Sequence, residues 1–120
     1  MMRILTVDDS RTMRDMLRLA LVKAGFHVIE AVDGVHGLEV LPQANADVII
    51  TDINMPRLDG FGFIEAVRED EAYRATPILV LTTESDPAKK NRAREAGATG
   101  WIVKPFHPDK LVEAIRRVAA

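Results

Sequence analysis

The chain has 120 residues, of which 48% are hydrophobic and 28% are charged, and it contains no cysteine. These values are typical of one globular domain, and they exclude disulfide bonds and thiolate-bound metals. The formal net charge of -2 disfavours a nucleic-acid-binding surface, and no segment reads as a signal peptide or a membrane span. We therefore expect a soluble, cytoplasmic protein that binds neither nucleic acid nor membranes.

Strand and helix patterns alternate along the whole chain. Runs rich in β-branched residues predict strands at residues 3–7, 27–31, 47–51, 78–82 and 101–104. Apolar residues spaced three and four apart predict helices at residues 11–25, 34–43, 60–70, 86–97 and 107–120. Ser10 or Asp9 is expected to cap the first helix, which Gly25 ends, and Pro87 and Gly97 mark the two ends of the fourth.

This alternation predicts an α/β fold, in which a parallel sheet lies between two layers of helices. The central runs are continuously apolar, as expected of strands that helices cover on both faces. In doubly wound sheets of this kind, ligands bind outside the carboxyl ends of the strands. The residues that follow each strand are therefore the candidates for a functional site.

Polar side chains stand at the carboxyl ends of four predicted strands. Asp8 and Asp9 follow the first strand, Asp52 follows the third, and Thr82 and Lys104 end the fourth and fifth. Because the carboxyl ends of parallel strands lie along one edge of the sheet, we expect these five side chains to converge.

Other polar and flexible residues have ordinary structural explanations. An isolated aspartate near a strand end is most often a helix cap or a turn residue, and we assign Asp33-Gly34 and Asp59-Gly60 to turns. Met13 and Met16 are expected to fill the core. The histidines lack the spacing of metal ligands.

The converging set favours phosphoryl chemistry. Carboxylates held close together repel one another, which raises the pKa of at least one of them, and a divalent cation removes this penalty. Oxygen ligands without His or Cys indicate a hard ion, and Mg²⁺ suits a site that also binds phosphate oxygens. A lysine and a threonine can then bind the remaining phosphoryl oxygens, and an aspartate can itself be the nucleophile that forms an acyl phosphate.

Four sequence blocks carry a family resemblance. The blocks VDDS, TDINMPRLDG, LTTES and GWIVKPF occur in this order and span the chain. Together they resemble response-regulator receiver domains, and most closely the single-domain regulators of chemotaxis. The resemblance implies a flavodoxin-like (βα)5 fold with strand order 2-1-3-4-5. It also implies one receiver domain over residues 1–120, with no output domain.

The resemblance assigns roles to the residues at the sheet edge. Asp52 matches the phosphoacceptor, and Asp8 and Asp9 match an acidic pair that binds Mg²⁺, with Asp9 as the direct ligand. The backbone carbonyl of Asn54 matches a further Mg²⁺ ligand. Lys104 matches the lysine that binds the phosphoryl group, and the family has a cis peptide bond after it.

The same resemblance implies a conformational switch. Thr82 matches the switch threonine, and Trp101 stands where the family has a smaller aromatic residue that moves inward on activation. Asn54 and Glu84 match positions that tune the lifetime of the phosphorylated form, and their identities imply a short one.

The resemblance implies a signalling protein rather than a classical enzyme. A partner histidine kinase would donate a phosphoryl group to Asp52 with Mg²⁺. The surface of the fourth helix, fifth strand and fifth helix would then bind a target such as the flagellar motor switch, until self-catalysed hydrolysis or a phosphatase reverses the change. Lys89, Lys90, Arg92 and Trp101 are the candidate partner-binding residues, although the basic residues also read as a solvated face. A monomer is the default expectation.

Alternative functions remain open in the sequence. Within the family, a phosphate sink or a phosphorelay intermediate fits the same residues. A Mg²⁺-dependent phosphohydrolase of the haloacid dehalogenase type also uses an aspartate nucleophile after a strand. That class would need a second aspartate where Asn54 stands. Nucleotide-binding domains are disfavoured because the glycine-rich phosphate-binding motifs are absent from the sequence.

Overall fold

The computed structural model describes all residues from 1 to 120. Its strands are β1 (Arg3–Val7), β2 (His27–Ala31), β3 (Val48–Thr51), β4 (Ile78–Thr82) and β5 (Gly100–Val103). Its α-helices are α1 (Arg11–Lys23), α2 (Gly34–Ala44), α3 (Gly60–Glu69), α4 (Pro87–Ala96) and α5 (Pro108–Ala119), and a short 3-10 helix covers Glu71–Tyr73. All strand pairs are parallel, and their order is β2-β1-β3-β4-β5, which confirms the expected fold and topology.

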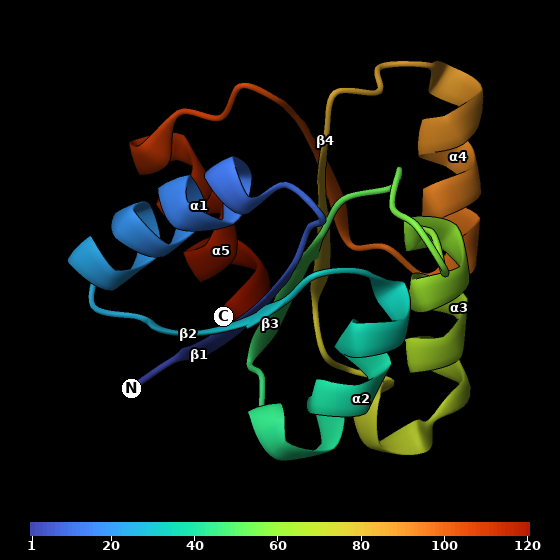
Figure 1. Ribbon diagram of the computed structural model, residues 1–120, viewed down its shortest axis with the longest axis horizontal. Coiled ribbons are helices and arrows are strands. Elements are labelled where there is room, and N and C mark those ends of the chain that lie inside the picture. Colours follow the sequence, from blue (N-terminus) through green and yellow to red (C-terminus); the bar gives the residue numbers. More distant parts are fainter.

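The helices form two layers on opposite faces of the sheet. Figure 1 shows α1 and α5 on one face, and α2, α3 and α4 on the other. The two chain termini lie near each other, since Met1, Met2 and Ala120 line one pocket. No helix is long and apolar enough to cross a membrane.

Each face of the sheet has its own hydrophobic core. The α2–α4 core joins the sheet to α2, α3 and α4, and includes Leu41, Phe63 and Ala93. The α1–α5 core joins the other face to α1 and α5, and includes Leu17 and Leu111. Every residue of β3 and β4 is buried, which explains why their sequences do not alternate.

Short polar side chains fix the starts of four helices. Ser10 caps α1 by accepting a hydrogen bond from the Met13 amide, which selects Ser10 over Asp9 as the cap. Asp33, Asp59 and Asp86 cap α2, α3 and α4 in the same way. Asp33 and Asp59 therefore have the ordinary structural role that was expected, but as helix caps rather than turn residues, because each carboxylate accepts from the helix that follows it.

Two other expectations need correction. Strand β5 ends at Val103, so Lys104 lies just beyond the strand, where its backbone amide donates to the carbonyl of Thr82 over 2.7 Å. Met16 does not fill the core, because it is 45% exposed. The helical spacing places Met16 at the edge of the apolar face, and the sheet covers only the centre of that face, at Leu17 and Leu21.

Candidate functional site

Three strands deliver charged side chains to one point at the carboxyl edge of the sheet. Asp8 follows β1, Asp52 follows β3 and Lys104 follows β5. The Lys104 Nζ atom donates to Asp8 Oδ2 over 2.9 Å and to Asp52 Oδ2 over 2.8 Å. The convergence expected from the strand ends is therefore present for these three residues.

The two buried carboxylates are held in fixed orientations. The second oxygen of Asp8, Oδ1, accepts from the Ser10 amide over 2.9 Å. The second oxygen of Asp52, also Oδ1, accepts from the Ile53 amide over 2.6 Å. Each carboxylate thus binds one backbone amide and one ammonium, so neither can rotate without losing a bond.

Asp9 completes an acidic cluster beside them. One carboxylate oxygen from each of Asp8, Asp9 and Asp52 lies within 4.8 Å of the other two. Asp8 and Asp52 are buried, whereas Asp9 is exposed. Clustered carboxylate oxygens, two of them withdrawn from solvent, fit the hard-ligand preference of Mg²⁺.

Burial and ion pairing shift the pKa values of this cluster in opposite directions. Burial raises the pKa of Asp8, and the hydrogen bond from Lys104 only partly offsets that rise. Burial also lowers the pKa of Lys104, but the hydrogen bonds to Asp52 and Asp8 and the negative charges of these carboxylates together outweigh burial and raise the pKa overall. The expected rise for a carboxyl group is present at Asp8, but burial contributes more to it than repulsion from Asp52 does.

Thr82, Glu84 and Trp101 form a chain of contacts next to the cluster. The Thr82 hydroxyl is fully buried and accepts from the Glu84 amide over 3.3 Å. The Trp101 indole N–H donates to the Glu84 carbonyl over 3.2 Å. The backbone of Glu84 therefore joins the threonine at the sheet edge to the half-buried tryptophan of β5.

The Glu84 side chain makes a second set of contacts across the site. Its Oε1 atom accepts from Asn54 Nδ2 over 3.1 Å and from Lys89 Nζ over 3.0 Å. The hydrogen bond from Asn54, followed by that from Lys89, lowers the pKa of Glu84. Asn54 and Glu84, which come from loops after different strands, are thus direct neighbours.

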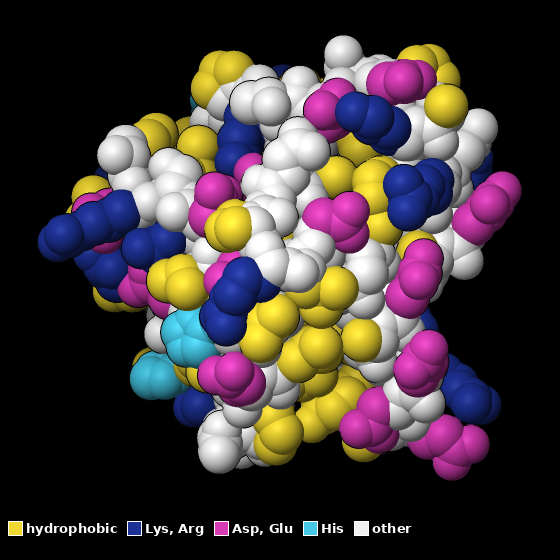
Figure 2. Space-filling view, turned by 45° about the vertical axis from the view of Figure 1, so that its right-hand side comes forward, with side chains coloured by type: hydrophobic (Ala, Val, Ile, Leu, Met, Phe, Trp, Pro, Cys, Tyr) yellow, Lys and Arg dark blue, Asp and Glu magenta, His cyan; other side chains and the backbone are white.

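The basic residues of α4 do not form one uniform surface. Lys89 binds Glu84, and the Arg92 guanidinium lies 4.1 Å from the centre of the Phe61 ring. Lys90 lines a separate small pocket together with Arg94 and Trp101. Figure 2 accordingly shows acidic and basic side chains interspersed on the face that carries α3 and α4.

Sequence reasoning missed several contacts that support this site. Arg14 Nη1 donates to the backbone carbonyl of Asp8 over 2.8 Å, and Arg57 binds Asp33 through two hydrogen bonds. The peptide bond between Lys104 and Pro105 is cis, as expected. The positions of Arg14 and Arg57 in the sequence do not predict these hydrogen bonds, because each bond depends on how separate segments fold against each other.

Comparison with known proteins agrees with this geometry. A family model of the response regulator receiver domain matches residues 4–116. The chain belongs to the response-regulator receiver family. As a receiver domain it is a signalling regulator rather than a classical enzyme, and receiver domains bind Mg²⁺ at an acidic pocket such as the Asp8, Asp9 and Asp52 cluster.

The receiver domain is similar to chemotaxis proteins over nearly its full length. It is 42% identical to chemotaxis protein CheY1 of Helicobacter pylori, in an alignment that covers 98% of this chain and 96% of that protein. It is 39% identical to chemotaxis protein CheY of Pseudomonas aeruginosa, with 98% and 95% covered. The structure of Vibrio cholerae CheY4 matches it with a TM-score of 0.94 and 47% identity over 98% of both chains.

Proposed function

We propose that this receiver domain is a chemotaxis response regulator that accepts a phosphoryl group on Asp52 from a phosphohistidine of a partner kinase. The observation that carries the proposal is the bridge from Lys104 to both Asp8 and Asp52, beside the exposed carboxylate of Asp9. This bridge supports the proposal because it brings the proposed nucleophile, Asp52, close to a candidate metal ligand and to a cationic side chain. The similarity of the whole chain to chemotaxis proteins of three bacteria supports a role in chemotaxis.

The transfer needs little from the protein beyond positioning and charge. An Asp52 carboxylate oxygen forms the new bond to phosphorus, the bond from phosphorus to the histidine nitrogen breaks, and the electron pair leaves with the imidazole. The Lys104 ammonium, already 2.8 Å from Asp52, is close enough to bind a phosphoryl oxygen as charge arrives. The fixed Asp52 orientation reduces the reorganisation that the step requires.

The cation site would use Asp8, Asp9, Asp52 and the backbone carbonyl of Asn54. Bound Mg²⁺ would neutralise the carboxylates and the charge that builds up on the phosphoryl oxygens. The contribution of the chain is to hold two of these carboxylates through the Ser10 and Ile53 amides.

The switch would begin at Thr82. A phosphoryl group on Asp52 offers the Thr82 hydroxyl a strong acceptor, and movement toward it pulls on the bond from the Glu84 amide. Because the Glu84 carbonyl also holds Trp101, a displaced Glu84 would release the indole to move inward. The surface of α4, β5 and α5, with Lys89, Lys90, Arg92 and Trp101, would then bind its target, such as a flagellar motor switch protein.

Asn54 and Glu84 would set how long the signal lasts. Asn54 follows Asp52 by two residues and its side chain binds that of Glu84, so the two together would control where a hydrolytic water approaches the acyl phosphate. Self-catalysed hydrolysis, with or without a phosphatase, would end the signal.

An apolar strip next to the site supports a protein donor. Met16, Leu19 and Val22 are 45%, 72% and 56% exposed along α1. Met16 and Leu19 line a groove with Phe106, which follows Lys104 by two residues. A strip of this kind fits the apolar face of a helix that presents its phosphohistidine to Asp52.

One experiment tests the proposal directly. The protein is incubated with a small phosphodonor, with and without Mg²⁺, and its intact mass is compared with that of Asp52→Asn. We expect a Mg²⁺-dependent phosphoryl adduct on the wild type alone, and its decay gives the lifetime. A folded, Mg²⁺-loaded protein that forms no adduct would refute phosphotransfer at Asp52.

A further inference from the structure

The loop that joins β3 to α3 carries much of the proposed cation site. It runs from Asp52 to Asp59 and contains Asn54. Its two ends are held by the scaffold, since the Asp52 amide donates to the Val7 carbonyl and the Gly60 amide donates to the Ile53 carbonyl. The middle of the loop has no such support from the sheet, so its path depends on the hydrogen bond from Asn54 to Glu84 and on further contacts.

The middle of this loop is a strained three-residue turn centred on Arg57. The Leu58 amide donates to the Pro56 carbonyl over 2.7 Å, and Arg57 has a φ of 65°, in the left-handed region. A turn of this hand around a residue other than glycine is rare and strained. Such a conformation persists only when contacts around it hold it in place.

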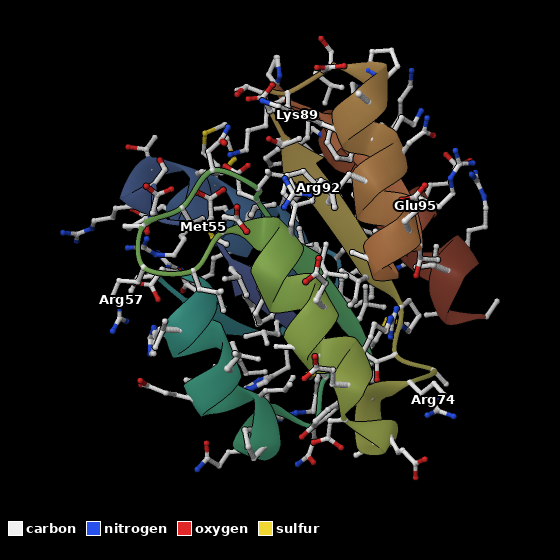
Figure 3. The ribbon with its side chains drawn as sticks, turned by 90° about the vertical axis from the view of Figure 1, so that its right-hand side faces the viewer. Met55, Arg57, Arg74, Lys89, Arg92 and Glu95 are labelled. Atoms are coloured by element: carbon white, nitrogen blue, oxygen red, sulfur yellow. The ribbon has the colours of Figure 1, made fainter.

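The contacts come from the start of α2. Arg57 Nε donates to Asp33 Oδ2 over 2.8 Å, and Arg57 Nη2 donates to Asp33 Oδ1 over 3.0 Å. The Asp33 carboxylate is itself held by the His36 amide at the N-terminus of α2, and Asp33 is 4% exposed. Figure 3 shows Arg57 on the loop beside this end of α2.

A second contact sits directly beside the first. The Gly34 amide donates to the Leu58 carbonyl over 3.2 Å. A Cβ atom at Gly34 would collide with that carbonyl oxygen, so the approach of the two backbones depends on glycine. The loop is therefore attached to the start of α2 at the centre of the strained turn, through Arg57, and at its last residue, Leu58.

We propose that Asp33 and Arg57 are a positioning pair, which holds the β3–α3 loop so that the Asn54 carbonyl is kept in place for the cation. This inference rests on the proposed function, because it deepens the description of the same site. Neither residue belongs to the acidic cluster. The pair acts through the backbone of Pro56 and Met55, which separates Arg57 from Asn54.

The substitution Arg57→Gly separates positioning from simple stability. Glycine relieves the strain at a φ of 65° and removes the guanidinium, so the melting temperature should stay near that of the wild type. The affinity for Mg²⁺, measured by isothermal titration calorimetry in the absence of any phosphodonor, should fall about 10-fold. A purely structural role for Arg57 would change the two quantities together.

Arg74→Gly is the matched control. Arg74 pairs with Glu71 in an exposed ion pair at the amino end of β4, and Figure 3 shows it at the other end of this face from Arg57. The control removes the same side chain and charge, so it should leave Mg²⁺ affinity within twofold of the wild type.

Two further variants complete the test. Asp33→Asn keeps a cap for α2 but loses the ion pair, and Arg57→Lys keeps the charge but loses the two-pronged geometry. Each should weaken Mg²⁺ binding, and combining Asp33→Asn with Arg57→Gly should add little to either alone. Wild-type Mg²⁺ affinity in all three single variants would overturn the positioning role. If the wild type itself binds no Mg²⁺, the proposed function fails first.

Discussion

The indole N–H of Trp101 donates a hydrogen bond to the backbone carbonyl of Glu84 over 3.2 Å. The amide of the same Glu84 donates to the Thr82 hydroxyl. A residue of the β4–α4 loop thus connects Thr82, at the proposed phosphorylation site, to the surface of β5. A phenylalanine or tyrosine side chain has no donor at the position of the indole nitrogen, so this bond depends on tryptophan.

Replacing Trp101 by phenylalanine should loosen this connection. The variant keeps an aromatic ring but leaves the Glu84 carbonyl without its donor, which should cost about 1 kcal/mol in the free energy of unfolding. With the bond gone, a smaller ring should also move inward more readily, so the variant should bind its target more tightly when unphosphorylated. Urea unfolding and target titration measure the two effects, and an unchanged stability would show that the bond contributes nothing.

Lys104→Met should destabilise the protein in Mg²⁺-free buffer. The substitution removes the ammonium that both buried carboxylates bind, which should cost about 3 kcal/mol. Adding Mg²⁺ should recover part of this loss, because a cation in the acidic cluster replaces the missing charge. Denaturant midpoints with and without Mg²⁺ test this, and a Lys104→Met loss that Mg²⁺ does not reduce would argue against a cation at the cluster.

Asp33 should make stability depend on pH. The side-chain hydrogen bond from Arg57 lowers the pKa of Asp33 below its usual value of 3.8. A carboxyl group with a lower pKa in the folded state stabilises the fold above its unfolded pKa, and this contribution is lost as the pH falls through the folded pKa. The stability advantage of the wild type over Asp33→Asn should therefore be largest near neutral pH and shrink below about pH 4. An advantage that is constant across this range would exclude the charged pair as its source.

Two glycines of α3 should respond in opposite ways to alanine. A Cβ atom at Gly60 would meet the Asp52 carbonyl and lie 2.7 Å from Ile53 Cα, so Gly60→Ala should shift the backbone of the site and cost about 1–3 kcal/mol. A Cβ atom at Gly62 meets the end of the flexible Leu58 side chain, and helix propensity favours alanine there by about 1 kcal/mol. Thermal unfolding of both variants tests the contrast, and Gly60→Ala should also slow the formation of the Asp52 adduct.

Leu19→Gln should slow phosphoryl transfer from a protein donor but not from a small-molecule phosphodonor. Leu19 is 72% exposed in the apolar strip of α1, so its replacement should leave the fold intact. Transfer from the phosphohistidine domain of a chemotaxis kinase should slow about fivefold or more, while phosphorylation by a small phosphodonor is unchanged. Ala75→Gln, on the exposed loop before β4, is the control. Equal transfer rates for Leu19→Gln and the control would remove α1 from the donor surface.

The sequence predicted the parts of the fold that depend on local pattern. The apolar runs located the strands, and the polar residues that end them located Asp8, Asp52 and Lys104 at one point, because parallel strands bring their carboxyl ends together. Met16 was misplaced because periodicity defines a helix face but not how much of that face the sheet covers. The three-residue helix Glu71–Tyr73 was missed because it is too short to show a period.

Contacts between loops were beyond the reach of sequence pattern. The pairing of Asp33 with Arg57 was missed because the two residues are 24 positions apart and nothing local signals the bond. The same holds for Asn54 and Glu84, which are 30 positions apart and were assigned as lifetime-tuning residues without any expectation that they touch. The two residues meet because they follow neighbouring strands of the sheet, β3 and β4, and this contact becomes visible only in the folded chain.

The two hydrophobic cores lie on opposite faces of the sheet, with α1 over one and α4 over the other. A substitution beneath α1 therefore need not repack the layer beneath α4. In evolutionary terms, the surface proposed for the kinase and the α4 part of the surface proposed for the target are free to diverge separately, whereas α5 shares its core with α1. A duplicated gene could therefore change its target through substitutions on α4 while it keeps its original kinase.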